Sequence, residues 1–158
     1  MSKTTAVIFD NGTVEHLFWA YDVALAVLFA HTIRIAARVP ASARCAGHDR
    51  LVADMEAQIE IGASIAVTLD SYDQELLRTF QSWLAEACDR LIDRGGAWAT
   101  EWRELGFPDR RHFRGAEHIE PGPVIDIATA IAQLLDGRLP PAPDGLHWFI
   151  GTSNITIC

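Results

Sequence analysis

The sequence predicts a mainly helical single domain over residues 1–158: a helical bundle of four to five helices with a small antiparallel β-sheet from the N- and C-terminal segments. Its 158 residues are enough for one domain and few for two. Apolar residues make up 49% and charged residues 22%, the balance of a folded globular chain. Apolar patterns with helical spacing fill the middle of the chain, and short β-branched runs lie near both ends.

The first predicted elements are a short strand and a long helix joined by a turn. Residues 5–9 are mostly β-branched or aromatic, and Asn11-Gly12 follows as a dipeptide that favours tight turns. Two continuations fit: a second strand over 14–19 that completes a hairpin, or a long helix. Because the apolar stretch continues without a break almost to Pro40, we expect a helix over about 14–38. This helix is apolar on nearly every side, which predicts that its neighbours bury it.

Three further helices have amphipathic patterns. Residues 49–66 carry a narrow apolar stripe opposite acidic side chains. A capping box, with serine at 71 and glutamine at 74, begins the clearest helix, over 72–94, and two glycines end it. Residues 123–136 have an apolar face that begins at a proline and ends before a glycine. Between them, 97–105 can form a short helix that carries two tryptophans.

The C-terminal segment predicts a β-hairpin. Residues 146–150 and 155–158 are two β-rich runs on either side of a four-residue turn. Because an isolated hairpin is marginally stable, we expect it to pair with residues 5–9 or with a second copy of the chain. An unpaired edge of this sheet would favour a homodimer contact.

The apolar segment 17–33 reaches the lower limit for a bilayer span. Asp22 and His31 interrupt it, and an ionisable group in hydrocarbon is costly, so we expect a buried helix and no membrane partner. The N-terminus shows no secretory signal. The three cysteines have no regular spacing, which predicts neither a disulfide framework nor a zinc site: Cys45, Cys88 and Cys158. We therefore expect a reducing, cytoplasmic location.

The charge balance excludes some partners and favours others. Lys and Arg number 13 and Asp and Glu 21, so the formal net charge is −8. Such a chain repels nucleic-acid backbones and anionic lipid, and we expect neither as a partner. An acidic surface instead attracts a basic protein partner, mainly by raising the rate of association.

No motif predicts a metal, a cofactor or an enzyme class. The chain has six histidines, but no metal-binding spacing, phosphate loop, nucleophile elbow or dinucleotide fingerprint occurs. A long-range site of His48, Glu56 and His118 remains open. So does a role for Glu56 and Glu60, one helical turn apart, on either side of a reacting group, although both lie opposite the apolar stripe. Whether the protein is an enzyme remains open.

The candidate ligand-binding residues lie on the first helix and on a basic loop. Asp22 is a charge on a helix predicted to be buried, so it needs a partner: an arginine such as Arg78 or Arg90, or a polar ligand. Residues 110–114 are the main concentration of positive charge and suit a small anion. A pocket between this helix and residues 107–118 would use Asp22, His31, Arg110, Arg111, His112, Arg114 and His118.

Two main hypotheses of function follow. The leading one is a cytoplasmic, non-catalytic protein that binds another macromolecule through its acidic surface, as an accessory or immunity-like subunit would. The alternative is a small helical-bundle enzyme or ligand-binding protein that uses the pocket beside Asp22. A third, a purely structural homo-oligomer, would show a large apolar interface.

Overall fold

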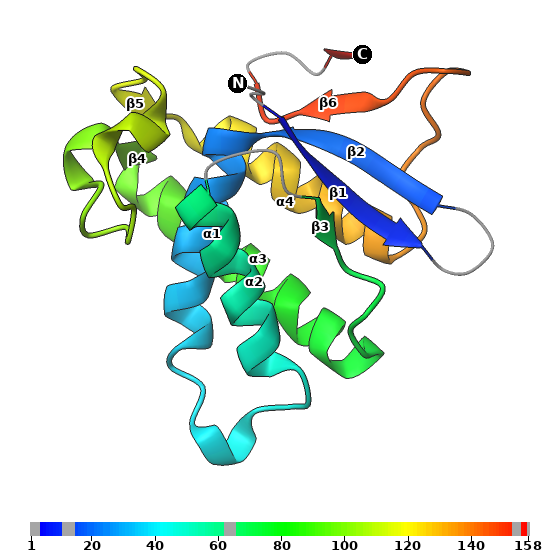
Figure 1. The fold of residues 1–158 in the computed structure, drawn as a ribbon, viewed down its shortest axis with the longest axis horizontal. Helices are drawn as coiled ribbons and strands as arrows, with labels where there is room; N and C mark the ends of the chain where they lie inside the picture. Colours follow the sequence, from blue (N-terminus) through cyan, green and yellow to red (C-terminus); the bar gives the residue numbers. More distant parts are fainter. Residues whose placement is uncertain (1–3, 11–14, 62–65, 153–155, 158) are drawn as a thin grey trace.

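A sheet and a group of helices form the two main parts of the structure (Figure 1). The computed structural model describes residues 4–10, 15–61, 66–152 and 156–157. The strands are β1 (Thr4–Asp10), β2 (Glu15–Tyr21), β3 (Val67–Thr68), β4 (Ala97–Trp98), β5 (His118–Ile119), β6 (Trp148–Ile150) and β7 (Thr156–Ile157). The longer helices are α1 (Asp22–Ala36), α2 (His48–Ile61), α3 (Gln74–Arg94) and α4 (Pro121–Leu135).

The prediction of helices with a small sheet is right in outline, but the sheet is mixed and not antiparallel. Its strand order is β3-β1-β2-β6-β7. β1 pairs antiparallel with β2 and parallel with β3, while β6 pairs parallel with β2 and antiparallel with β7. β4 and β5 form a separate antiparallel pair. The sheet therefore joins both ends of the chain to a strand from its middle.

The helix predicted for 14–38 is wrong over its first residues. β2 takes residues 15–21 and pairs with β1 from Thr4–Tyr21 to Asp10–Glu15, so the hairpin is the correct continuation. The Asn11-Gly12 turn lies outside the described residues. Phe18 and Ala20 are buried on β2, while their neighbours are half-buried. Because both faces of β2 are partly covered, its apolar run lacks the clear alternation that distinguishes a strand from a helix.

The remaining part of that prediction is confirmed: α1 is a helix enclosed by its neighbours. Thirteen of its 15 residues are buried. It contacts α2, α3 and α4, and in Figure 1 it runs downward from the left end of β2. An apolar surface on every side, which would suit a bilayer, is here covered by protein. Among the described residues, no helix combines the length and the apolar character that crossing a bilayer requires.

Two other helices differ from their predicted bounds. α2 is described over His48–Ile61; residues 62–65 of the predicted 49–66 helix lie outside the described residues, residue 66 is not helical, and Val67 begins β3 beside β1. α3 matches its prediction except at its N-terminus, where the Asp73 carboxylate, and not Ser71, caps the helix by accepting a hydrogen bond from the Leu76 amide at 2.8 Å. Backbone geometry decides which residue occupies the N-cap. Serine and aspartate are both favourable there, so the sequence alone does not distinguish Ser71 from Asp73.

The short helix predicted over 97–105 does not form. Residues 97–98 are β4, which pairs with β5, and only a single 3-10 turn follows, over Ala99–Glu101. The strand pairing is a long-range contact, and it overrides the local helical spacing of the two tryptophans.

The C-terminal hairpin is confirmed as β6 and β7, but its neighbour is β2 and not the predicted 5–9 strand. The predicted partner strand is already paired on both sides, with β2 and with β3. α4 extends over Pro121–Leu135, close to the predicted 123–136, and contacts α1, α3, β1, β2 and β6.

Candidate functional site

The basic loop folds against the helices and is held there by two aromatic side chains. Residues Arg110–Phe113 form a 3-10 turn, and the Asp109 carboxylate caps it by accepting from the Arg111 amide at 2.6 Å. Phe107 and Phe113 are buried, with their rings edge-on at 5.2 Å between centroids. These phenylalanines are therefore part of the hydrophobic core.

Arg114 is the partner of the buried Asp22. Its Nε donates to Oδ2 of Asp22 at 2.7 Å, and its Nη2 lies 2.5 Å from the same oxygen. The other carboxylate oxygen, Oδ1, accepts from the Val23 amide at 2.9 Å. The partner is an arginine from another segment, as predicted, but it is neither of the two suggested examples: Arg78 is exposed, and Arg90 lies 3.1 Å from Glu86 on α3.

The backbone and the helix both contribute to this ion pair. Arg114 has φ of 49°, a left-handed conformation that is uncommon for a residue with a side chain. Asp22 is the first residue of α1, where the helix dipole favours a negative charge. Burial raises the pKa of the Asp22 carboxyl, and the hydrogen bond and charge of Arg114 oppose that rise. A carboxylate with 4% exposure is thus stabilised by a cation from a segment 92 residues away.

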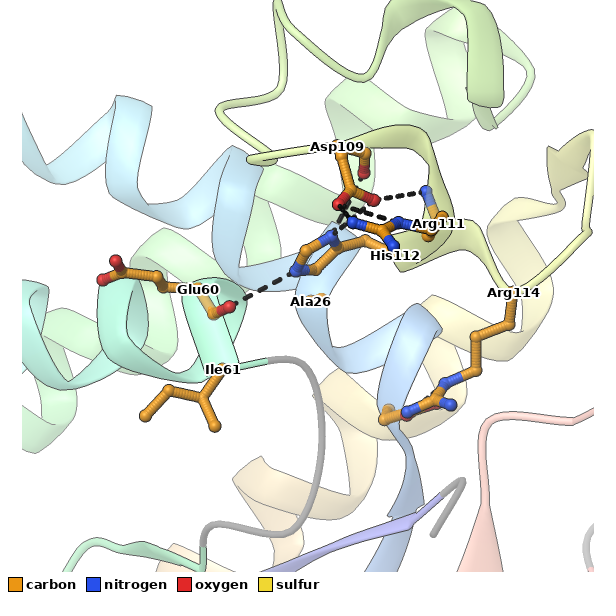
Figure 2. A pocket seen from close by; sticks show the side chains of 8 residues that line it. Ala26, Glu60, Ile61, Asp109, Arg111, His112 and Arg114 are labelled. Atoms are coloured by element: carbon orange, nitrogen blue, oxygen red, sulfur yellow. Dashed lines mark hydrogen bonds and ion pairs between the residues drawn. The ribbon is translucent and has the colours of Figure 1, made fainter. Parts of the chain in front are cut away.

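His112 connects the loop to the C-terminal turn of α2. Its Nδ1 lies 3.1 Å from the Asp109 carbonyl oxygen, and its Nε2 lies 3.4 Å from the Glu60 carbonyl oxygen. Figure 2 shows the ring between these two residues, with the Glu60 carboxylate directed away from it. The loop is therefore attached to α1 through Arg114 and to α2 through His112.

A small hollow lies between the loop and these helices, and we call it the Asp22 hollow. Its volume is about 170 Å³, and it is lined by Asp22, Ala26, Glu60, Ile61, Asp109, Arg111, His112 and Arg114 (Figure 2). Both arginines of the lining are already paired, Arg114 with Asp22 and Arg111 with Asp109 at 2.8 Å, and the third acidic residue, Glu60, directs its carboxylate away from the His112 ring (Figure 2). This balance gives no surplus positive charge for an anion, and the small anionic ligand stays a prediction.

The structure brings four of the seven predicted site residues together and separates the other three. Asp22, Arg111, His112 and Arg114 all line the Asp22 hollow. Arg110 forms an exposed ion pair with Glu117. His118 stacks on the Trp98 ring with 4.2 Å between centroids, and its Nε2 lies 2.7 Å from the Gly95 carbonyl oxygen.

His31 lies elsewhere on α1, and it is buried without an ion pair to a described residue. Its exposure is 3%, and no described residue is a partner of its Nε2 atom. Burial, with the positive charges of Arg94, Arg34 and Arg90, lowers the pKa of His31 to about 4. At neutral pH, this imidazole is therefore uncharged and part of the core.

The metal site of His48, Glu56 and His118 does not form. His48 is buried, with Nδ1 3.0 Å from an Asp49 carboxylate oxygen and Nε2 3.3 Å from the Ala36 carbonyl oxygen. Within the described ranges, no three His, Cys, Asp or Glu side chains gather closely enough to hold a metal ion.

A larger groove, which no sequence pattern predicts, lies next to the Asp22 hollow, and we call it the Glu104 groove. It has a volume of about 430 Å³ and is lined by Ala30, Ile33, Arg34, Glu56, Ile59, Glu60, Glu104, Leu105, Gly106 and Pro108. Glu60 borders both the hollow and the groove. The one-turn spacing of Glu56 and Glu60 was visible in the sequence, but no local signal placed Glu104 opposite them.

The groove combines an apolar floor with an acidic rim. Ala30, Ile59 and Leu105 are buried in its floor. The three glutamates are exposed, and none forms an ion pair with a described residue. The same holds for Arg34, the one cation in the lining. The rim therefore carries a surplus of negative charge.

Comparison with known proteins adds no relative: no family model, curated protein or solved structure matches this chain.

Proposed function

We propose that the protein is a non-catalytic binding protein that holds a basic segment of another protein in the Glu104 groove. The observation that carries this proposal is the set of three exposed carboxylates, without ion pairs to described residues, around an apolar floor. The cytoplasmic location and the accessory or immunity-like role expected from the sequence belong to the same proposal.

The chemistry of the groove matches the chemistry of lysine and arginine side chains. Both have apolar stems and charged ends, so they can cover an apolar floor while their charges remain at a polar rim. The floor at Ile59 and Leu105 would contact the stems, and the rim carboxylates would pair with the charged ends. An anionic or purely apolar segment would leave the three carboxylates without partners.

The groove is also held in shape before a partner arrives. Two walls are the packed helices α1 and α2, which contact one another. The third wall, residues 104–108, precedes the loop that Arg114 and His112 attach to those helices. Preorganisation favours binding, because less conformational entropy is lost when the partner docks.

Fluorescence anisotropy with two labelled peptides tests the proposal. One peptide alternates lysine and leucine, and the other replaces each lysine by glutamate. We expect the lysine peptide to bind and the glutamate peptide not to bind. The affinity of the lysine peptide should fall as the salt concentration rises, because salt screens exposed charges. Equal binding of both peptides, or none of the lysine peptide at low salt, would overturn the proposal.

A matched pair of triple variants separates the groove from the net charge of the protein. Glu56→Gln, Glu60→Gln and Glu104→Gln together remove the rim carboxylates. The control combines Glu75→Gln, Asp89→Asn and Asp93→Asn, three exposed acids on α3 that lie outside the groove lining. Both proteins lose the same formal charge, so we expect at least tenfold weaker binding in the groove variant and less than threefold in the control. Equal losses would mean that overall charge, and not the groove, binds the peptide.

The homodimer expected from the sequence is a separate prediction. Two copies that met through the Glu104 groove would place like charges together, which is unfavourable. Light scattering at several protein concentrations measures the oligomeric state directly.

A further inference from the structure

Arg34 is the exception to the acidic character of the Glu104 groove. It lies in the last turn of α1, lines the groove and is exposed. It forms no ion pair with a described residue, although three carboxylate side chains line the same groove. A guanidinium group binds carboxylates well, because its N–H donors match both carboxylate oxygens. The groove therefore offers one position for a negative group beside its positions for positive groups.

The packing of α1 against α2 fixes the order of these charges along the groove. The two helices run in opposite directions (Figure 1): His48, at the start of α2, has its Nε2 3.3 Å from the carbonyl oxygen of Ala36, at the end of α1. At the other end of the helix pair, Ala26 and Glu60 together line the neighbouring hollow. Glu60 therefore lies at the end of the groove next to that hollow, and Arg34 lies toward the opposite end.

The separation of these charges is long enough for a bound segment to distinguish them. With Ala36 and His48 level, a rise of 1.5 Å per residue places Arg34 about 15 Å from Glu60 along the helix axes and about 9 Å from Glu56. An extended segment rises about 3.3 Å per residue, so about five of its residues span the first separation and about three span the second. Different residues of one segment therefore meet the cation and the carboxylates.

We propose that the segment held in the Glu104 groove carries one acidic residue, which pairs with Arg34 at the end of the groove away from the Asp22 hollow, while its lysines or arginines pair with the rim glutamates. This inference rests on the proposed function, because it adds a charge order to the partner of the same groove. Arg34 and the three rim glutamates are exposed, and the neighbouring Ile33 is half-buried, so a docking segment reaches each of them. A uniformly basic segment would instead place a positive charge beside Arg34, which is unfavourable.

Three isomeric peptides with capped ends test this charge order by fluorescence anisotropy at low salt. Each has seven residues, in which leucine alternates with three lysines and one glutamate. The glutamate is at the first position, at the last position or at an inner position. Both ends are included because a segment can run through the groove in either direction. The three peptides have the same composition and net charge, so a difference in affinity reports the position of the acid alone.

We expect the better of the two end-glutamate peptides to bind at least fivefold more tightly than the inner-glutamate peptide. Only a glutamate at an end reaches Arg34 while the lysines stay beside the rim carboxylates. If the inner-glutamate peptide binds as tightly as both end-glutamate peptides, while the all-lysine peptide still binds, this inference is overturned and the proposed function stands. No binding of any peptide, the all-lysine peptide included, would overturn both.

Two variants of Arg34 and a matched control assign the preference to this side chain. Arg34→Gln removes the cation, so the preference for an end glutamate should fall below twofold. Arg34→Glu reverses the charge, and it should also strengthen binding of the all-lysine peptide. The control is Arg78→Glu, an exposed arginine on α3 outside the groove lining, which changes the formal charge as much as Arg34→Glu does and should keep the fivefold preference. A preference that persisted in folded Arg34→Gln, or that Arg78→Glu also removed, would contradict the role of Arg34.

Discussion

The Asp22 hollow and the Glu104 groove are neighbours that share Glu60, yet they use charge in opposite ways. In the hollow, Asp22 is buried and pairs with Arg114, and the exposed Arg111 pairs with Asp109. In the groove, Glu56, Glu60 and Glu104 are exposed and form no ion pair with described residues.

The difference follows from the cost of removing a charge from water. A carboxylate as buried as Asp22 would be strongly destabilising without its partner, so its pairing is a condition of folding. An exposed carboxylate keeps its hydration and can stay unpaired at little cost. The pairing of the charges in a pocket, more than their number, therefore distinguishes a structural contact from a surface that can bind a partner.

The largest expected effect comes from breaking the buried ion pair. Arg114→Leu leaves the Asp22 carboxylate buried and unpaired, and we expect it to lower the free energy of unfolding by about 3–5 kcal/mol. Urea denaturation followed by circular dichroism measures the change.

Two further variants serve as controls for Arg114→Leu. Arg110→Leu breaks an exposed pair whose side chains are 53% and 70% exposed, so it should cost less than about 1 kcal/mol. The double variant Asp22→Asn with Arg114→Leu removes both charges, and it should recover part of the loss. Equal effects of Arg114→Leu and Arg110→Leu would contradict the claim that burial sets the cost of losing an ion pair.

A second prediction contrasts His31, which is buried without an ion pair to a described residue, with the paired Asp22. The pKa of His31 falls to about 4 in the folded chain, so the unfolded chain binds a proton more readily. The contribution of the neutral ring to the free energy of unfolding is therefore fully present above about pH 6.5. It decreases by on the order of 3 kcal/mol as the pH falls toward 4. His31→Leu should remove this loss between pH 6.5 and 4.

The measurement is the difference in unfolding free energy between His31→Leu and the unchanged protein at several pH values. Asp22, whose raised pKa acts in the opposite direction, is present in both proteins and cancels in the difference. A difference that did not vary with pH would mean that the imidazole is solvated in the folded chain.

The smallest expected effect concerns the unpaired charges of the groove. Glu56 and Glu60 are one turn apart on α2, where like charges repel. Glu60→Gln should therefore raise the free energy of unfolding by about 0.2–0.5 kcal/mol at low salt. The gain should disappear at 1 M salt, where the screening length is about 3 Å.

Glu75→Gln is the matched control, because Glu75 lies in the first turn of α3 and the helix dipole favours its negative charge. It should lower stability slightly at low salt. A loss of stability in Glu60→Gln would mean that this carboxylate already has a favourable partner, against its role as an unpaired rim group.

Several elements could be predicted because their signals are local. The apolar face and glycine stop of α3 lie within one segment, and so do the two runs of the C-terminal hairpin. The sequence pattern places β2 in the helix, because its apolar residues merge with those of α1 and give no clear period. Four of the predicted site residues line one hollow, but the specific pairing of Asp22 with Arg114 had no signal in the sequence, and ligand binding by these residues stays a prediction.

By itself, the sequence determined the composition of the core, the acidic surplus, the enclosed α1 and most helix boundaries, because these depend on residue type and short spacings. Only the tertiary structure decided which strand borders β6, which arginine reaches Asp22 and which glutamates line the same groove. Those outcomes depend on contacts between distant segments, such as the 92 residues between Asp22 and Arg114. Many alternative pairings satisfy the same local patterns, and only packing of the whole chain selects one of them.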